Sequence, residues 1–195
     1  MRRDYAELID GKPVGKRYPE IIDGKPVMMS PRPSVSHNAI VMNVTRIFST
    51  FLRGKRCRVF VDGVDVHLDE ENTVAPDVLI VCDKGKIKYD GIHGAPDLVV
   101  EVLSPSTQKY DRTTKKALYE RFGVKELWLV DPLSKSIEVF HLRDGRLELD
   151  DVRTVIPDYE LADMDEDEKR DALLPVKVSL YDDLLVDVAE VFEDV

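Results

Sequence analysis

The sequence predicts an α/β fold in which a mixed central sheet is flanked by helices, and three features support this prediction. Short, continuous apolar runs at 78–82, 98–103 and 127–130 are typical of interior strands that are buried on both faces. A helical segment at about 107–122 lies between the last two runs and is expected to end at Gly123. Because the joints are short, this order of strand, helix and strand predicts a parallel strand pair at the centre of the sheet.

Two short repeats precede this region. LIDGKPV at 8–14 recurs as IIDGKPV at 21–27, and each copy places Asp-Gly between apolar pieces. This pattern is typical of a β-hairpin, because glycine accepts the positive φ of a tight turn. We therefore expect consecutive edge hairpins, or one hairpin preceded by a mobile leader. Ser34 or Ser36 is expected to cap the helix that follows.

A long amphipathic helix is expected at about 35–53, with Gly54 as its stop signal. His37 lies on the apolar stripe of this helix and therefore faces the core or whatever lies at the helix N-terminus. Two interpretations are open: a half-buried histidine with satisfied hydrogen bonds, or a group that contacts phosphate or supports a catalytic site. The other stripe positions are Val41, Val44, Phe48 and Phe51.

Further strands are predicted from alternation and turn residues. Residues 57–68 alternate well enough for a strand that is bent at Gly63. Residues 136–142 and 146–149, which Arg-Asp-Gly joins, are typical of an antiparallel hairpin at a sheet edge.

The end of the chain is strongly acidic. We expect a loop or a poorly ordered segment at 158–172, then a strand at 176–180 and a short helix at about 182–192. The expected divisions of the chain are a leader or edge hairpin at 1–17, a core at 18–157, and a C-terminal segment at 158–195 that packs on the same domain.

Length and composition are typical of a soluble globular protein. The chain has 195 residues, of which 43% are hydrophobic and 34% charged, so we expect one domain with a substantial core. No apolar run approaches the roughly 18 to 20 residues of a membrane span, and the N-terminus lacks the apolar region of a signal peptide. We therefore expect a cytoplasmic protein with no membrane partner. Cys57 and Cys82 lack CxxC spacing and are expected to be reduced core thiols.

The net charge of −10 is unfavourable for binding nucleic acid. Much of this charge lies at 163–171, where six acidic residues stand against two basic ones, so the rest of the chain is closer to balanced. Basic groups at 53–58 and 84–88 would have to supply any DNA contact. Both clusters are also typical of solvated loops that make no DNA contact.

Two carboxylates stand beside the predicted interior strands. Glu101 shares one strand face with Val99 and Leu103, so a bare carboxylate there would be costly and needs a salt bridge, a metal or a raised pKa. Asp77 follows Pro76 at the start of another run, where a turn aspartate would also be ordinary. If the two strands are neighbours, Asp77 and Glu101 can face each other and bind a hard divalent cation.

The helix at 107–122 adds a lysine. At about 100° per residue, Lys115 lies on the stripe that faces the sheet, whereas Lys116 points to solvent. A lysine on an apolar stripe needs a carboxylate or a phosphate, and Asp111, one turn earlier, is a local alternative partner. Tyr119, one turn later, is expected to serve packing rather than catalysis.

These residues also carry a resemblance. The pattern PDV, GAPDLVVEVLSPST, D-x-x-x-K-x-x-x-Y and GVKELWLVDP resembles the Uma-type putative restriction endonuclease family of the PD-(D/E)XK nuclease superfamily. The resemblance extends upstream to EIIDGKPVMMSP and covers roughly 18–142. It implies a restriction-endonuclease-like fold and Mg²⁺-dependent hydrolysis of DNA, with Mn²⁺ as a substitute ion.

The resemblance assigns roles by position. Asp77 matches the motif aspartate and Glu101 its acidic partner, and these two, with the Val102 carbonyl, would hold the metal. The superfamily's usual lysine would stand at Leu103, which is a departure. In this family the lysine moves to the following helix, and Lys115 is the matching position.

Three further residues are candidates for an accessory role. Glu20 matches the family's early glutamate, and His37 lies within the matched region. Asp97 shares the strand face of Glu101 one repeat earlier and would help to bind metal.

The leading hypothesis is therefore a metal-dependent nuclease that acts on DNA, with endonucleolytic cleavage and a homodimer expected by analogy, because cutting two strands needs two sites. The alternative class is an inactive nuclease fold that binds nucleic acid or protein. Hydrolysis of a smaller phosphoester is a third reading that the sequence does not separate from the first.

Overall fold

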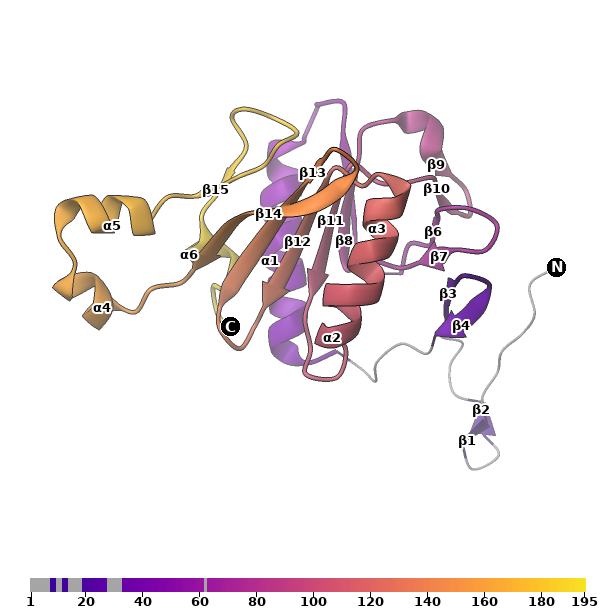
Figure 1. Cartoon of the computed structure of the whole chain (residues 1–195), viewed down its shortest axis with the longest axis horizontal. Coiled ribbons are helices and arrows are strands. Elements are labelled where there is room, and N and C mark those ends of the chain that lie inside the picture. Colours follow the sequence, from indigo (N-terminus) through magenta and orange to yellow (C-terminus); the bar gives the residue numbers. More distant parts are fainter. Residues whose placement is uncertain (1–7, 10–11, 14–18, 28–32, 62) are drawn as a thin grey trace.

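The computed structural model describes residues 8–9, 12–13, 19–27, 33–61 and 63–195. It confirms the predicted fold class, since two mixed sheets and their helices form the chain (Figure 1). Every helix in the described part of the chain is too short or too polar to cross a bilayer.

The larger sheet has six strands in the order β14-β13-β12-β11-β8-β5. β11 and β12 run parallel, whereas the other neighbouring pairs are antiparallel. The predicted central parallel pair and the predicted edge hairpin are therefore confirmed. In sheet order the strands span Arg146–Thr154, Ser136–Arg143, Glu126–Asp131, Leu98–Val102, Val78–Val81 and Arg58–Val61.

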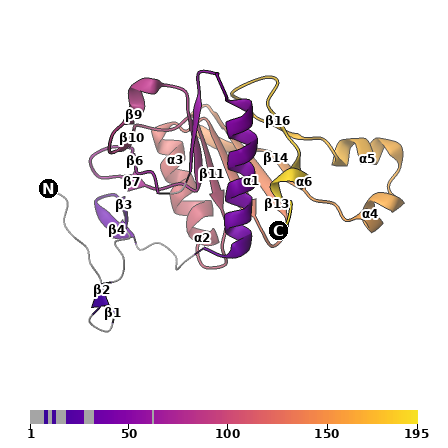
Figure 2. The same ribbon diagram turned by 180° about the vertical axis from the view of Figure 1, so that it is seen from behind.

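One helical layer covers each face of this sheet (Figures 1 and 2). α1, which spans Val35–Phe51, packs on one face and buries Ile40 and Phe48 against Trp128. Its N-cap is Ser34, whose hydroxyl accepts a hydrogen bond from the His37 backbone N at 3.1 Å. The predicted helix is thus confirmed, and its first turn is fixed at the end of the sheet where Asp77 lies.

The other face packs against one continuous helical segment between β11 and β12. The segment ends at Gly123, whose φ of 79° is left-handed and suits glycine. A π-helical turn interrupts it, and such turns often mark functional sites. Its parts are α2 at Gln108–Tyr110, the π turn η2 at Asp111–Lys115, and α3 at Lys116–Phe122.

The smaller sheet lies beside the α3 face and has the order β4-β3-β7-β6-β10-β9. Its hairpin β3–β4 turns through Asp23 and Gly24, both with positive φ, as the Asp-Gly motif predicts. The strands, in chain order, are Glu20–Ile22, Lys25–Val27, Val66–His67, Thr73–Val74, Ile87–Lys88 and Gly91–His93. Its importance is that β3 brings Glu20 to the larger sheet.

The expected hairpin in the first repeat is present as β1 at Leu8–Ile9 and β2 at Lys12–Pro13. The rest of the expected leader lies outside the described residues. The single strand predicted at 57–68 is wrong in one respect, because β5 and β6 belong to different sheets. The chain leaves the larger sheet near Gly63, whose φ is +90°.

The acidic segment is helical, which corrects the prediction of a loop. α4 spans Asp158–Asp163 and α5 spans Glu166–Ala172. Asp165 and Glu168 form a reciprocal capping box, so acidic residues that suggest disorder by composition here stabilise a helix N-terminus.

The last elements are shorter than predicted. β15, at Val176–Lys177, pairs with β16, at Leu185–Val186. The expected helix at 182–192 is reduced to α6, Val188–Val191.

The two cysteines form a disulfide, so the prediction of reduced thiols is wrong. The register of β5 and β8 pairs Arg58 with Val81, which places Cys57 opposite Cys82 at the next step along the strands. Sequence reasoning missed the pairing because the two runs were not predicted to be neighbours.

Because the disulfide closes a loop with a sequence separation of 25, its removal should lower the free energy of unfolding by about 3 kcal/mol. Urea unfolding of the wild type with and without reductant measures this. The double variant Cys57→Ser, Cys82→Ser is the control, since it should match the reduced wild type and be insensitive to reductant. An unchanged unfolding midpoint on reduction would contradict the bridge.

Candidate active site

The strand register brings the two predicted carboxylates together. β8 and β11 are antiparallel neighbours in which Val78 pairs with Val100, so Asp77 and Glu101 face each other one step further along. Glu101 is 3% exposed and lies on the face that Val99 and α3 share, as predicted. The structure thus produces the facing pair that a cation site requires.

Lys115 reaches Glu101 from the helical layer. Its Nζ lies 2.9 Å from Glu101 Oε1 and 3.0 Å from Glu20 Oε1, and the residue is 4% exposed. Lys116 turns the other way, is partly exposed and donates to the Leu147 carbonyl at 2.7 Å. The predicted burial of Lys115 is confirmed, whereas Lys116 is half-buried against Leu147 and does not extend freely into solvent. The ion-pair partners of Lys115 lie on two strands and not on its own helix at Asp111.

Glu20 joins the smaller sheet to this site. Its Oε1 accepts a hydrogen bond from the Ala75 backbone N at 3.1 Å in addition to its contact with Lys115. Glu20 is 5% exposed, so its charge is balanced mainly by the lysine. Both sheets and the helix therefore meet at one ammonium group.

Tyr119 is also part of the site. Its buried hydroxyl donates to Glu101 Oε1 at 2.5 Å, so the expectation of packing alone was incomplete. Tyr119 lies one helical turn after Lys115, and this shared stripe was the available sequence signal. The hydrogen bond fixes the orientation of the carboxylate.

Asp77 is held from two sides. Its Oδ2 accepts a hydrogen bond from the Val102 backbone N at 2.7 Å, and its Oδ1 lies 3.2 Å from His37 Nε2. His37 stands in the first turn of α1, so this helix aims its N-terminus at the site. The side chain of Asp77 keeps 18% exposure, which leaves it open to solvent.

The electrostatics of the site show an excess of negative charge. The carboxylates of Glu20, Asp77 and Asp111 all act on that of Glu101, and among the described residues the main cation that opposes them is Lys115, which pairs with Glu20 and Glu101. Burial raises the pKa of Glu101 to about 8; Lys115 opposes this shift, and the other three carboxylates add to it. Burial also raises the pKa of Asp111. A divalent cation would offset this repulsion, and an oxygen-rich donor set suits Mg²⁺ or Mn²⁺.

Lys115 is a permanent cation in this setting. Burial alone lowers its pKa, but the surrounding carboxylates, Glu101 foremost, raise the pKa well above its ordinary value. The group therefore acts as a fixed positive charge and a hydrogen-bond donor, and not as a general base.

Tyr110 was not expected from the sequence. Its hydroxyl is buried and has no hydrogen-bond partner among the described residues. Burial raises its pKa to about 12, and the carboxylates of Glu20, Asp111 and Glu101 contribute to that shift. An unsatisfied donor beside the carboxylate cluster suits a bound oxygen ligand such as water or phosphate.

Asp97 lies elsewhere. Its Oδ1 pairs with Lys125 Nζ at 2.7 Å, and its Oδ2 accepts from the Cys82 backbone N at 2.7 Å. It precedes β11, whereas Glu101 lies near the end of that strand. The structure thus brings Glu20 and His37 together with Asp77, Glu101 and Lys115, and it places Asp97 in a separate ion pair.

The predicted basic patch at 53–58 also lies away from this site. α1 has 17 residues and is therefore about 25 Å long, with His37 at one end and this patch beyond the other. Lys55 pairs with Asp183, and Arg56 donates to the Cys82 carbonyl. These residues make structural contacts and do not line the carboxylate cluster.

Comparisons with known proteins connect this geometry to a family. The family profile described as "Uma2: Putative restriction endonuclease" matches residues 3–165, which include every residue of the cluster. The chain is 33% identical over 113 residues to the uncharacterized protein slr1290 of Synechocystis, covering 57% of this chain and 60% of that protein. It is 25% identical over 109 residues to the uncharacterized protein sll1609 of the same organism, covering 54% and 62%. The chain therefore matches about three fifths of the length of these relatives.

A solved structure shares the fold. The crystal structure of a protein from Anabaena variabilis, described as a putative nuclease belonging to DUF820, aligns with a TM-score of 0.66 over 89% of both chains. The sequences are 22% identical, so this similarity concerns the fold.

The Glu101 carboxyl should titrate near pH 8 in the metal-free protein, and millimolar Mg²⁺ should move the midpoint to lower pH. Carboxyl NMR measures this directly. Because Lys115 lowers the Glu101 pKa, Lys115→Met should raise the midpoint further. The folded pKa exceeds the unfolded value of about 4.3, so this group's contribution to stability is complete below that pH and is lost as pH rises through 8. A midpoint near 4.3 in the folded protein would contradict the account.

Proposed function

We propose that this chain, which belongs to the Uma2 family of putative restriction endonucleases, is a divalent-metal-dependent nuclease that hydrolyses DNA phosphodiester bonds by endonucleolytic cleavage. One observation carries the proposal: the buried carboxylates of Glu20 and Glu101 share the Lys115 ammonium where the two sheets meet, and Asp77 and Asp111 add negative charge beside Glu101. This arrangement has more carboxylates than ammonium groups and provides oxygen ligands for a metal cation.

Asp77 and Glu101, with the Val102 carbonyl, would hold Mg²⁺, for which Mn²⁺ can substitute. When bound, this ion would polarise the scissile phosphate and lower the pKa of a coordinated water. His37 would keep the Asp77 carboxylate oriented, since its Nε2 already lies 3.2 Å from Asp77 Oδ1. Tyr119 would do the same for Glu101 through its hydroxyl.

Lys115 would supply the fixed positive charge in the reaction. Its Nζ lies 2.9 Å from Glu101, so it can donate to the attacking water or to a phosphate oxygen beside that carboxylate. Such a donor stabilises the charge that develops on phosphorus in the transition state. Glu20 would hold the ammonium from the opposite side.

The reaction would follow an in-line displacement. The oxygen of water attacks phosphorus and forms the new P–O bond, while the bond from phosphorus to the 3′ oxygen breaks. The attacking water gives up one proton and the 3′ oxygen takes up one, which leaves a 3′-hydroxyl and a 5′-phosphate. A dimer would present two such sites to the two strands of a duplex.

A second candidate function is a non-catalytic module that binds nucleic acid or protein. The net charge of −10 and the structural contacts of the basic patch favour it. The retention of a complete, buried carboxylate and lysine cluster favours the enzyme, because removing unused buried charge is often stabilising. Hydrolysis of a smaller phosphoester would use the same groups, and a comparison of DNA with small phosphodiesters separates the two.

Asp77→Ala, Glu101→Ala and Lys115→Ala should each reduce cleavage of plasmid and single-stranded DNA by about 100-fold or more, since each removes a metal ligand or a transition-state donor. Gel assays with Mg²⁺ and with Mn²⁺ measure this. Lys116→Ala is the matched control, because the neighbouring lysine faces away, and it should retain wild-type activity. Equal activity in all five proteins would sink the assignment.

Tyr119→Phe should lower activity about tenfold, since one hydrogen bond to a charged group is lost. It should also move the acid limb of the pH profile to higher pH, because the hydroxyl stabilises the ionised form of Glu101. Tyr181→Phe, which removes a hydroxyl beside Cys57, serves as the control and should leave the profile unchanged. An unshifted acid limb in Tyr119→Phe would mean that the tyrosine only fills space.

A further inference from the structure

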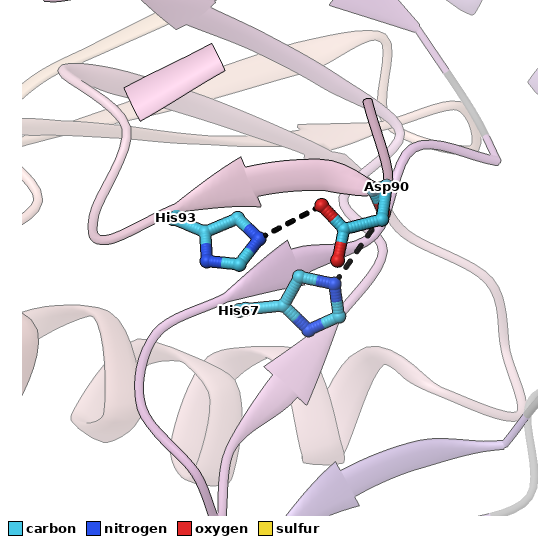
Figure 3. A group of neighbouring side chains, drawn as sticks. All are labelled: His67, Asp90 and His93. Carbon is cyan, nitrogen blue, oxygen red and sulfur yellow. Dashed lines mark hydrogen bonds and ion pairs between the residues drawn. The ribbon is translucent and has the colours of Figure 1, made fainter. Parts of the chain in front are cut away.

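A second group of ligand side chains lies on the smaller sheet, outside the carboxylate cluster. His67 ends β6 and His93 ends β10, and these parallel strands pair the two histidines directly. Asp90 stands in the turn just before β10. Figure 3 shows both imidazole rings and the Asp90 carboxylate lying toward one another.

The ligand atoms are close enough to share one ion. One atom from each of the three side chains can be chosen so that all lie within 4.8 Å of one another. His93 Nε2 lies 3.0 Å from Asp90 Oδ1, and the two ring centroids are 4.9 Å apart. Four-coordinate Zn²⁺ holds such ligands at about 2.0 to 2.2 Å, so small side-chain shifts would suffice.

The backbone and a neighbouring hydroxyl hold this arrangement in place. His67 Nδ1 lies 3.0 Å from Thr73 Oγ1, which fixes the ring, and Nε2 lies 3.4 Å from the Asp90 backbone carbonyl oxygen. Such a contact to the second ring nitrogen is typical of metal-binding histidines. Gly91, with φ of +144°, lets the turn approach the backbone of Asp65, since a Cβ at this position would lie 2.3 Å from the Asp65 carbonyl oxygen.

A simple ion pair explains less of this geometry. An exposed pair between Asp90 and His93 at a turn contributes little to stability. The pair also does not involve His67, whose Nε2 lies 3.4 Å from the Asp90 backbone carbonyl oxygen and which offers a ring nitrogen within 4.8 Å of the ligand atoms of Asp90 and His93. Two nitrogen ligands from adjacent strands and one carboxylate from the turn before β10 form a set that fits one metal ion.

We propose that His67, Asp90 and His93 bind a divalent transition-metal ion of the zinc class, with water in the fourth position. Imidazole ligands favour Zn²⁺, Cu²⁺ or Ni²⁺, whereas Mg²⁺ prefers oxygen ligands alone, so this site and the carboxylate cluster select different ions. Asp90 and His93 are exposed and His67 is half-buried, which leaves the ion a path from solvent.

The position of this site gives the ion a structural role. It would join β6 to β10 and to the turn that precedes β10. β6 pairs with β7, and β7 pairs with β3, the strand that carries Glu20. Metal binding would therefore stabilise the sheet that delivers Glu20 to Lys115. The proposal rests on the geometry of the three ligands alone and does not depend on the nuclease assignment.

Zn²⁺ and Co²⁺ binding to the metal-stripped full chain tests the proposal, with excess Mg²⁺ present to compete at the carboxylate cluster. Elemental analysis after dialysis should give one Zn²⁺ per chain, and Co²⁺ should produce the intense visible bands of four-coordinate nitrogen and oxygen ligation. Zn²⁺ should also raise the Tm of the wild type. His67→Ala and His93→Ala should each weaken binding by about 100-fold or more and remove the Co²⁺ bands.

Two controls separate this site from the rest of the molecule. Asp77→Ala should retain the bound Zn²⁺, because it alters only the carboxylate cluster. His141→Gln should also retain it, because that histidine contacts Asp150 on a different sheet. Circular dichroism establishes that each variant is folded, and His67→Gln replaces His67→Ala if the latter is not. Absence of Zn²⁺ from the wild type, or equal binding by the wild type and both histidine variants, would overturn the proposal.

Discussion

The ion pair between Lys115 and Glu101, extended to Glu20, joins the helical layer to the central strand β11 and to β3 of the smaller sheet through one ammonium group. Taking these charges out of water costs several kcal/mol per ion, so removing one partner would leave an uncompensated charge in the core. The three elements are therefore held in one relative arrangement. Asp77 is the carboxylate that remains partly accessible to solvent.

The positive charge beside Glu101 comes from a helix and not from strand position 103, where the resemblance places the superfamily's usual lysine. Leu103, on the same strand face as Glu101, is buried against the α3 layer and contributes packing. Lys115 brings its ammonium to Glu101 from the helix instead, at the end of the π-helical turn. The chemistry depends on where the Nζ atom lies, and the helix places it 2.9 Å from the carboxylate.

Much of this site could be predicted because it follows from periodicity. Strand alternation identified Glu101, and helical phase selected Lys115. Asp77 became a candidate because its strand could lie beside that of Glu101. Contacts that depend on tertiary placement could not be derived in this way: Glu20 was named only through a resemblance and its contact with Lys115 was not predicted, and the hydrogen bond of Tyr119 was missed. The disulfide was missed for the same reason, since it depends on which strands are neighbours. The helices at 158–172 were missed for a different reason: the acidic composition of the segment outweighed a local capping box at Asp165 and Glu168.

The proposed cation site rests on the excess of carboxylates beside Glu101. The anomalous scattering of a crystal of the wild-type chain soaked in millimolar Mn²⁺ tests this site. We expect one ion within coordination distance of both Asp77 and Glu101, with Lys115 still beside Glu101, and no ion at this place in Glu101→Gln. An empty position between the two carboxylates in the wild type would rule out the cation site and favour a non-catalytic module.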